Sequence, residues 1–249
     1  MTHQADSTYP PLGTLKGVAE DVWVVDGPII RFGMPWPKMP FPTRMTIVRL
    51  NGRDLFVHSP TPLAPALKEA IAALGMVRWI IGPNRLHYAW IPDWHADYPD
   101  AAVYLSPRIR EQSRGRIDFA ASMLEQDHGY PWDKELATLP VTGSFMTEVE
   151  FFHYESRTLI LTDLIENFES DKLDSWPMRW LTRVGAVLDP DGSMPRDMRL
   201  TFRKHRAGLR AAVETMVSWN PEQIILAHGR CYGSDGAAEL RRAFRWVLE

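Results

Sequence analysis

The sequence is poor in cysteine and has no strong excess of charge of either sign. Cys231 is the single cysteine, so the chain cannot form an internal disulfide, which is typical of a reducing compartment. Lys and Arg number 28 and Asp and Glu 31, giving a formal net charge of -3. This balance gives no reason to expect a nucleic acid or a lipid surface as partner.

Long apolar runs, repeats and nucleotide-binding motifs are also missing. No apolar run approaches the roughly 20 residues of a membrane-spanning helix, and residues 1–11 lack the charged-then-apolar pattern of a signal peptide. We therefore expect a cytoplasmic protein. There is no GxxxxGK loop or glycine-rich dinucleotide fingerprint, which argues against a nucleotide cofactor. With 249 residues and 45% hydrophobic content, we expect a flexible arm over residues 1–12 and a single domain over 13–249.

The first half of the chain is rich in predicted strands. Residues 22–25 and 29–32 are β-type runs separated by a predicted turn, and residues 44–50 and 54–58 flank Asn51-Gly52, the strongest short signal for a hairpin. A helix over 63–74 and a buried strand over 77–81 follow, and the order hairpin, helix, strand begins an α/β layered domain.

The remaining elements alternate between strands and helices. Residues 33–42, with four prolines, are predicted to be a loop that either covers a pocket or wraps the sheet edge. Residues 88–98 are expected to begin as a helix that Pro92 breaks. Further strands are expected at 102–105, 148–152, 158–161 and 223–226, and helices at 107–113, 117–126, 176–184, 196–219 and 236–248.

Polar residues follow several of the strand-like runs. His58 follows the second hairpin strand, Asn84 and His87 follow 77–81, Asp163 follows 158–161, and His228 follows 223–226. Site residues converge at strand ends in layered α/β folds, and two imidazoles with a carboxylate can bind a divalent transition metal.

The order of these residues resembles the metallo-β-lactamase superfamily over nearly the whole chain. That superfamily has an early hairpin, a His-x-His-x-Asp-His motif after a buried strand, a later Asp and a terminal Gly-His-Gly. Asn84-Arg85-Leu86-His87, Leu161-Thr162-Asp163 and Ala227-His228-Gly229 are similar to its three motifs. The combination with His58-Ser59-Pro60 resembles a branch described as a domain of unknown function. The resemblance implies a four-layer αββα sandwich.

Most metal ligands of that superfamily are replaced in this sequence. The motif positions of the first His, the second His and the Asp fall on Gly82, Asn84 and Leu86, and the middle His expected near residues 142–145 is absent. The resemblance therefore implies a mononuclear site, with His87, Asp163 and His228 as metal ligands. His58 and Asn84 are expected to support the ligands or to line the pocket.

Each of these residues also has a purely structural explanation. His87 could be a capping or core histidine, Asp163 an N-cap or turn residue, and His228 a turn residue before a helix. His58 is expected to hydrogen-bond a ligand rather than to bind metal, and Asn84 could only shape the turn after Pro83.

Three functions follow from the sequence. The first is a hydrolase of a small-molecule substrate that uses one divalent transition metal, namely zinc, iron or manganese. The second is a non-catalytic protein that binds a small molecule or serves as a scaffold. The third is an iron-dependent oxidoreductase, because two His and one carboxylate are also the ligands of non-haem iron enzymes. The sequence leaves open whether the chain is a monomer or a homodimer.

Overall fold

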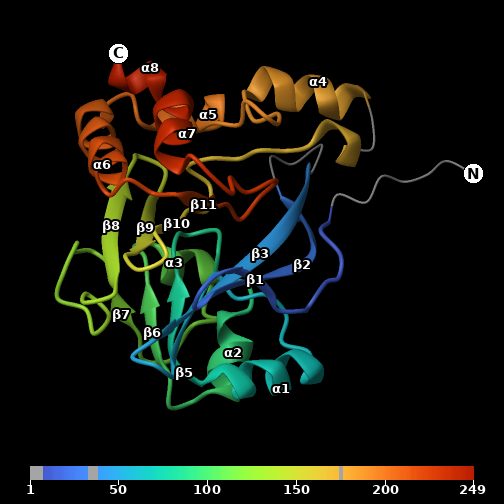
Figure 1. Cartoon of the computed structure of the whole chain (residues 1–249), viewed down its shortest axis with the longest axis vertical. Coiled ribbons are helices and arrows are strands. Elements are labelled where there is room, and N and C mark those ends of the chain that lie inside the picture. The colour runs from blue at the N-terminus through green and yellow to red at the C-terminus, as the bar shows by residue number, and fades with distance from the viewer. Residues whose placement is uncertain (1–7, 33–38, 174–175) are drawn as a thin grey trace, which may run out of the picture.

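Two β-sheets pack face to face with helices on their outer sides, as a computed structural model shows (Figure 1). The structure describes residues 8–32, 39–173 and 176–249. The strand order is β1-β2-β3-β4-β5-β6-β7 in the first sheet and β11-β10-β9-β8 in the second. The architecture is the predicted α/β sandwich.

The first sheet is formed by the first half of the chain. Its strands are β1 (Lys16–Ala19), β2 (Val22–Phe32), β3 (Met39–Leu50), β4 (Asp54–His58), β5 (Met76–Gly82), β6 (Ala102–Leu105) and β7 (Ser122–Met123). The strands β1 to β4 are antiparallel neighbours, and β4 to β7 run parallel. The helices associated with this half are α1 (Pro65–Leu74), α2 (Ile91–Asp97) and α3 (Ile109–Ser113).

The second sheet is formed by the later part of the chain. Its strands are β8 (Leu136–Thr142), β9 (Thr147–His153), β10 (Thr158–Ile160) and β11 (Gln223–Ile225), with β10 and β11 parallel. The helices of this part are η1 (Ser170–Lys172), α4 (Trp176–Gly185), α5 (Arg196–Thr201), α6 (Arg206–Ser218), α7 (Gly236–Ala243) and α8 (Arg245–Leu248).

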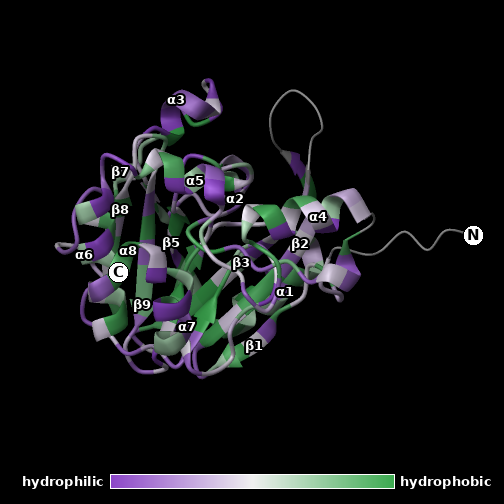
Figure 2. Cartoon of the chain, turned by 90° about the horizontal axis from the view of Figure 1, so that it is seen from above, coloured by the Kyte–Doolittle hydropathy of each residue, from purple (hydrophilic) through white to green (hydrophobic). Residues whose placement is uncertain are grey.

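Three apolar clusters join the four layers. One lies between the first sheet and its helices, and includes Leu67 and Trp94. A second lies between the two sheets, where Phe56 and Trp132 meet edge to face with ring centroids 5.0 Å apart. The third joins the second sheet to α6, α7 and α8. Figure 2 shows hydrophobic residues concentrated on the strands inside, with hydrophilic residues toward the outer faces of α3 and α5. This alternation of apolar interfaces fixes the layer order.

Local turn chemistry explains the hairpin of β3 and β4. Asn51 and Gly52 have φ angles of 48° and 76°, in the left-handed region that these residue types favour, and with Arg53 they form a three-residue loop between the paired Leu50 and Asp54. The predicted hairpin at these residues is confirmed.

Several predicted elements differ from the structure. Residues 39–42 belong to β3 rather than to a loop, while residues 33–38 of that segment lie outside the described residues. The two runs at 22–32 form one strand with a register shift after Asp26. Pro92 begins α2 rather than breaking it, since the first turn of a helix tolerates proline.

The helices predicted at 117–126 and 196–219 are also wrong. Ser122–Met123 pairs with β6, and Leu124 is buried and donates its backbone N–H to Leu105. Residues 196–219 form α5 and α6, because the chain turns at the buried Phe202, whose ring fills the space beside Gly143. No glycine or proline marks this turn in the sequence. Among the described residues, no helix has both the length and the apolarity that crossing a bilayer requires.

Candidate metal centre

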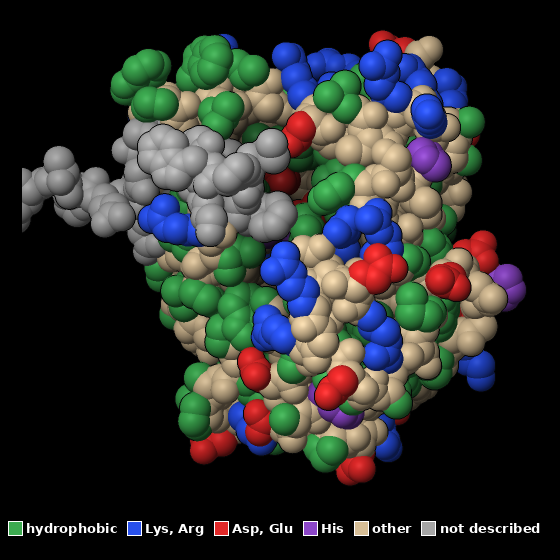
Figure 3. All heavy atoms as spheres, turned by 180° about the vertical axis from the view of Figure 1, so that it is seen from behind, with side chains coloured by type: hydrophobic (Ala, Val, Ile, Leu, Met, Phe, Trp, Pro, Cys, Tyr) green, Lys and Arg blue, Asp and Glu red, His purple; other side chains and the backbone are tan. Residues whose placement is uncertain are grey.

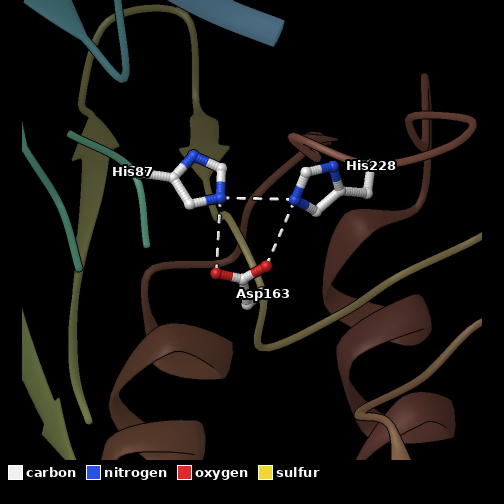
Figure 4. A group of neighbouring side chains, drawn as sticks. All are labelled: His87, Asp163 and His228. Carbon is white, nitrogen blue, oxygen red and sulfur yellow. Dashed lines mark hydrogen bonds and ion pairs between the residues drawn. The ribbon is translucent and has the colours of Figure 1, made fainter. Parts of the chain in front are cut away.

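Three loops that follow strands bring His87, Asp163 and His228 to one point (Figure 4). His87 lies five residues after the end of β5, whereas Asp163 and His228 each lie three residues after β10 and β11. Because β10 and β11 run parallel and are paired, their carboxyl ends open on the same edge of the second sheet. The sequence positions are 141 residues apart at their extremes, so only the folded chain assembles the group.

The three side chains are close enough to share one ligand. His87 Nε2 lies 3.3 Å from Asp163 Oδ2, and His228 Nε2 lies 3.2 Å from Asp163 Oδ1. The two Nε2 atoms are 3.3 Å apart. The side chains of His87, Asp163 and His228 are 8%, 7% and 4% exposed, so the group is almost closed to solvent.

Hydrogen bonds on the far side of each imidazole orient the rings. His228 Nδ1 lies 2.7 Å from the carbonyl oxygen of Pro42, which can only accept, so Nδ1 carries the proton. His87 Nδ1 lies 2.7 Å from Ser59 Oγ. Partners of this kind fix the tautomer and ring orientation of metal-binding histidines. In neutral His228 the Nε2 lone pair therefore faces the carboxylate and His87.

Asp163 is held by a buried polar network. Asn84 Nδ2 donates to Asp163 Oδ2 at 2.6 Å, and Glu148 Oε2 lies 3.1 Å from the same nitrogen. The Glu148 carboxylate accepts from the backbone N–H groups of Thr162, Asp163 and Leu164 at 2.8 to 3.1 Å. Hydrogen bonds from amides to an ionised carboxylate are among the stronger ones in proteins. This network fixes both the Asp163 side chain and the backbone that carries it.

A buried arginine braces the loop that carries His228. Arg44 Nη1 donates to the carbonyl oxygens of Leu226 and Gly229 at 2.6 and 2.9 Å, on either side of His228. The Asp26 carboxylate pairs with the Arg44 guanidinium at 2.8 Å. The phenyl ring of Phe41 packs edge-on against the His228 ring, with centroids 5.2 Å apart. Residues 33–42 were predicted to be a loop, and the described end of this segment, at Phe41 and Pro42, borders the site.

The electrostatics of the group follow from its contacts. Burial alone would raise the pKa of Asp163, but His87 and His228 outweigh it and hold the pKa of that carboxyl well below its usual range. Burial would lower the pKa of His228, yet its hydrogen bond and charge interaction with Asp163 raise that pKa above the ordinary value. The group therefore favours a positive charge between the imidazoles and the carboxylate.

A divalent metal fits this donor set. Zinc binds imidazole nitrogen and carboxylate oxygen at about 2.0 to 2.2 Å, so two ligands at a tetrahedral angle lie about 3.4 Å apart. The observed separations of 3.2 and 3.3 Å between donor atoms are close to that value. Two imidazoles and one carboxylate also match the preferences of iron and manganese.

Two further predicted positions have different surroundings. Asn84 is fully buried and contacts Asp163, as described. His58 is buried beside the group, and no described residue hydrogen-bonds its Nε2. The hydrogen bond to His87 comes from the next residue, Ser59. Burial, with the nearby His87, lowers the pKa of His58 to about 3, so the ring is neutral.

The structure also shows why one expected ligand position carries no ligand. A Cβ atom on Gly82 would lie 2.7 Å from Ile109 Cδ1 and 2.9 Å from Ile91 Cδ1. These contacts are shorter than ordinary van der Waals separations, so the apolar core leaves no room for a histidine there.

Four further residues lie around the group and were not predicted from the sequence: Ser59, Glu148, Glu166 and Arg44. A signal existed for Glu148, because acidic residues within the otherwise apolar strand β9 require buried partners. Glu166 is buried, and burial raises its pKa to about 8, with His228 opposing and Asp163 adding to the shift.

A family model and several solved structures are similar to this chain. A family model described as a domain of unknown function (DUF4336) matches residues 37–180. No curated protein matches the sequence. Among solved structures, DIM-1 metallo-β-lactamase exposed to ceftazidime is 14% identical with a TM-score of 0.62, covering 94% of this chain and 95% of its own.

Two further solved structures are similar to this chain in fold. A metallo-β-lactamase from Hirschia baltica has a TM-score of 0.59 at 14% identity, covering 94% of this chain and 97% of its own. The metallo-β-lactamase FIM-1 from Pseudomonas aeruginosa in its mono-zinc form has a TM-score of 0.57 at 12% identity, with full coverage of both chains. At such identities the likeness establishes the fold, and the predicted metallo-β-lactamase fold is confirmed.

Proposed function

The chain belongs to the family described as a domain of unknown function (DUF4336), and from its fold and donor set we propose that it is a hydrolase that uses one divalent metal. The observation that carries the proposal is the meeting of two imidazole nitrogens and a carboxylate, all within 3.3 Å of a neighbour in the group. Donor atoms that lie this close together in a nearly closed space favour a positive charge, and a divalent metal would supply it to all three at once.

The proposed ligands are His87, Asp163 and His228, and the surrounding residues hold them in place. Ser59 and the Pro42 carbonyl orient the two rings, while Asn84 and Glu148 orient the carboxylate. When bound, a divalent metal supplies Lewis acidity, which polarises a carbonyl or phosphoryl oxygen and acidifies water.

A single metal is the occupancy that the residues favour. Gly82 and Leu86 occupy positions where the resemblance places further metal ligands. Neither residue has a side-chain atom that can bind a metal. Asn84 already shares its amide nitrogen among three oxygen atoms, those of Glu148, Thr162 and Asp163. The structural neighbour FIM-1 was solved in a mono-zinc form, so a protein of this fold can hold one zinc.

A further buried carboxyl, that of Glu166, lies close enough to His228 and Asp163 for their charges to affect its pKa. The small exposed fractions of the metal ligands favour a small-molecule substrate.

Metal content measured on protein purified without chelator tests the proposal. We expect about one zinc, iron or manganese per chain, and loss of that metal in Asp163→Asn, which keeps the shape but removes the charge. The matched control is Asp118→Asn, at an exposed position. Metal-loaded wild type, but not Asp163→Asn, should cleave chromogenic ester, phosphodiester or lactam substrates.

Two results would contradict parts of the proposal. Absence of metal that none of the three ions restores would contradict the metal centre and leave a non-catalytic ligand-binding or scaffold protein. Selective retention of iron together with oxygen consumption would instead favour the iron-dependent oxidoreductase, since the same three ligand types serve non-haem iron.

A further inference from the structure

A cavity of about 480 Å³ lies between the segment after α4 and the helices α5, α7 and α8, away from the proposed metal centre. None of the three proposed metal ligands lines it. Lys and Arg side chains gather along this upper part of the molecule in Figure 3. Five arginines line the cavity, and they come from four helices: Arg183, Arg196, Arg199, Arg242 and Arg245.

Most of these arginines have no acidic partner. Arg183, Arg196 and Arg245 are exposed and form neither an ion pair nor a hydrogen bond through their side chains with other described residues. Arg199 donates only to neutral groups, the Met194 carbonyl at 3.0 Å and Ser193 Oγ at 2.7 Å. Arg242 is the exception, with Glu239 at 2.7 Å and Asp191 at 3.9 Å. Four of the five guanidinium groups therefore have no acidic partner among the described residues.

The neighbouring guanidinium groups affect the pKa of Arg199. Burial, followed by the charges of Arg196 and Arg245, lowers the pKa of Arg199. Two acidic residues also line the cavity, but Asp189 is engaged by Asn167 at 2.9 Å and by Arg230 at 3.4 Å, and Asp191, which is 82% exposed, lies 3.9 Å from Arg242. Five arginines against two aspartates leave the cavity positively charged.

A further donor lines the same cavity. The indole Nε1 of Trp246 is buried and has no acceptor among the described residues. The guanidinium of Arg199 stacks on the Trp246 ring, 5.0 Å from its centroid, which holds that arginine in place. The cavity thus offers guanidinium groups, one of which is held by an aromatic ring of its wall.

We propose that this cavity binds a small molecule or a headgroup that carries two or more phosphate groups. Guanidinium groups bind phosphate oxygens through paired hydrogen bonds, and several arginines around one cavity suit an anion with more than one charge. The volume is within the usual range of small-molecule sites, about 300 to 1,000 Å³. The proposal does not depend on the metal centre or its function.

The source of the phosphate is either a free metabolite or a lipid headgroup. Helix α4 carries Arg183 and also exposes Trp176 and Trp180, which are 78% and 61% accessible. Exposed aromatic side chains beside basic ones are typical of helices that lie on anionic membranes. A lipid source would use both features, whereas a free phosphate would use only the arginines.

Calorimetric titration with pyrophosphate tests the cavity, on chelator-treated protein so that no metal contributes. In Arg196→Gln/Arg245→Gln we expect affinity to fall about tenfold or more, because two of the unpaired guanidinium groups are gone. The control Arg53→Gln/Arg114→Gln removes the same charge from exposed positions elsewhere and should change affinity by less than about twofold. Thermal unfolding should be unchanged in both.

Sedimentation with vesicles separates the two sources. Binding to phosphatidylcholine vesicles that contain phosphatidylinositol bisphosphate, reduced by Trp176→Ser/Trp180→Ser without a change in pyrophosphate affinity, would identify a lipid headgroup. Pyrophosphate binding without vesicle binding would identify a free phosphate. The proposal is overturned if wild type binds neither probe, binds pyrophosphate no more tightly than sulfate, or loses as much affinity in the control as in the cavity variant.

Discussion

The loop after β5 and the loops after β10 and β11 carry side chains to the same point but are built differently. No buried charged side chain among the described residues hydrogen-bonds the backbone of the first loop. Ile91 and Ile109 close the space beside Gly82 at the end of β5, and the uncharged Asn84 accepts from the backbone N–H groups of Leu86 and His87. Buried charged groups dominate the other two, where Glu148 binds three consecutive amides and Arg44 binds two carbonyls around His228.

This difference matches the distribution of potential ligands. The first loop offers a single one, His87, and the loops of the second sheet offer Asp163 and His228. Backbone groups that are held by buried charges cannot move without leaving those charges unpaired, which is costly. The loops after β10 and β11 are therefore expected to be more rigid than the loop after β5. Removing a buried charge from them should cost more stability.

Removing the charge of Glu148 should produce the largest effect. In Glu148→Gln the carboxylate that accepts from the amides of residues 162–164 is replaced by a group with one acceptor oxygen. We expect the free energy of unfolding to fall by about 2 to 4 kcal/mol, as buried amides lose a charged partner. Urea denaturation of metal-free protein measures this change.

Glu150 provides the matched control on the same strand. It is fully buried, accepts no hydrogen bond from the described residues, and burial together with the Glu148 carboxylate raises its pKa well above the ordinary value. Because no described donor hydrogen-bonds its carboxyl, Glu150→Gln should change stability by less than about 1 kcal/mol. Equal losses in the two variants would show that charge is not what braces this loop.

A smaller effect is expected from filling the space in the first loop. In Gly82→Ala the added methyl group meets three apolar side chains, with the shortest contact 2.7 Å. Overpacking of this kind costs about 1 to 3 kcal/mol, which thermal or urea unfolding would detect. Gly208→Ala is the control, because a Cβ there meets nothing within 4 Å. An unchanged stability for Gly82→Ala would mean that packing does not exclude a ligand at this position.

The smallest effect concerns pH and the loop that carries His228. Asp163 raises the pKa of His228, and a metal can bind only to the neutral imidazole. Metal affinity should therefore be low where His228 is protonated and should rise with pH, by about tenfold per unit, until the raised pKa is passed. Zinc titrations with a competing chelator from acidic to mildly alkaline pH would show this rise, and a flat profile would contradict the assignment of His228.

The sequence predicts those features that depend on neighbouring residues. The Asn51-Gly52 hairpin and the strands that precede His87, Asp163 and His228 have local patterns, and their ends place the three side chains at sheet edges. The break between α5 and α6 has no such pattern. It depends on Phe202 packing beside Gly143, a contact between residues far apart in the chain.

The supporting network depends even more on distant contacts. Arg44 lies within a strand, and its carbonyl partners lie more than 180 residues away. His58 was expected to hydrogen-bond a ligand because the resemblance places a supporting residue after the hairpin, whereas the side chain that hydrogen-bonds His87 is that of the next residue, Ser59, which has a positive φ of 53°. A sequence pattern cannot distinguish two adjacent polar residues whose directions are set by one turn.

The contact between Arg44 and the loop of His228 also determines when the site can form during synthesis. The carbonyl partners of Arg44, at Leu226 and Gly229, lie 182 and 185 residues later, so these hydrogen bonds cannot form until residue 229 has been made. Closing a loop of this length has an entropic cost that is met before the contact forms. A ribosome-bound chain that ends before residue 226 lacks His228, one of the three proposed ligands, and we expect that it does not capture metal.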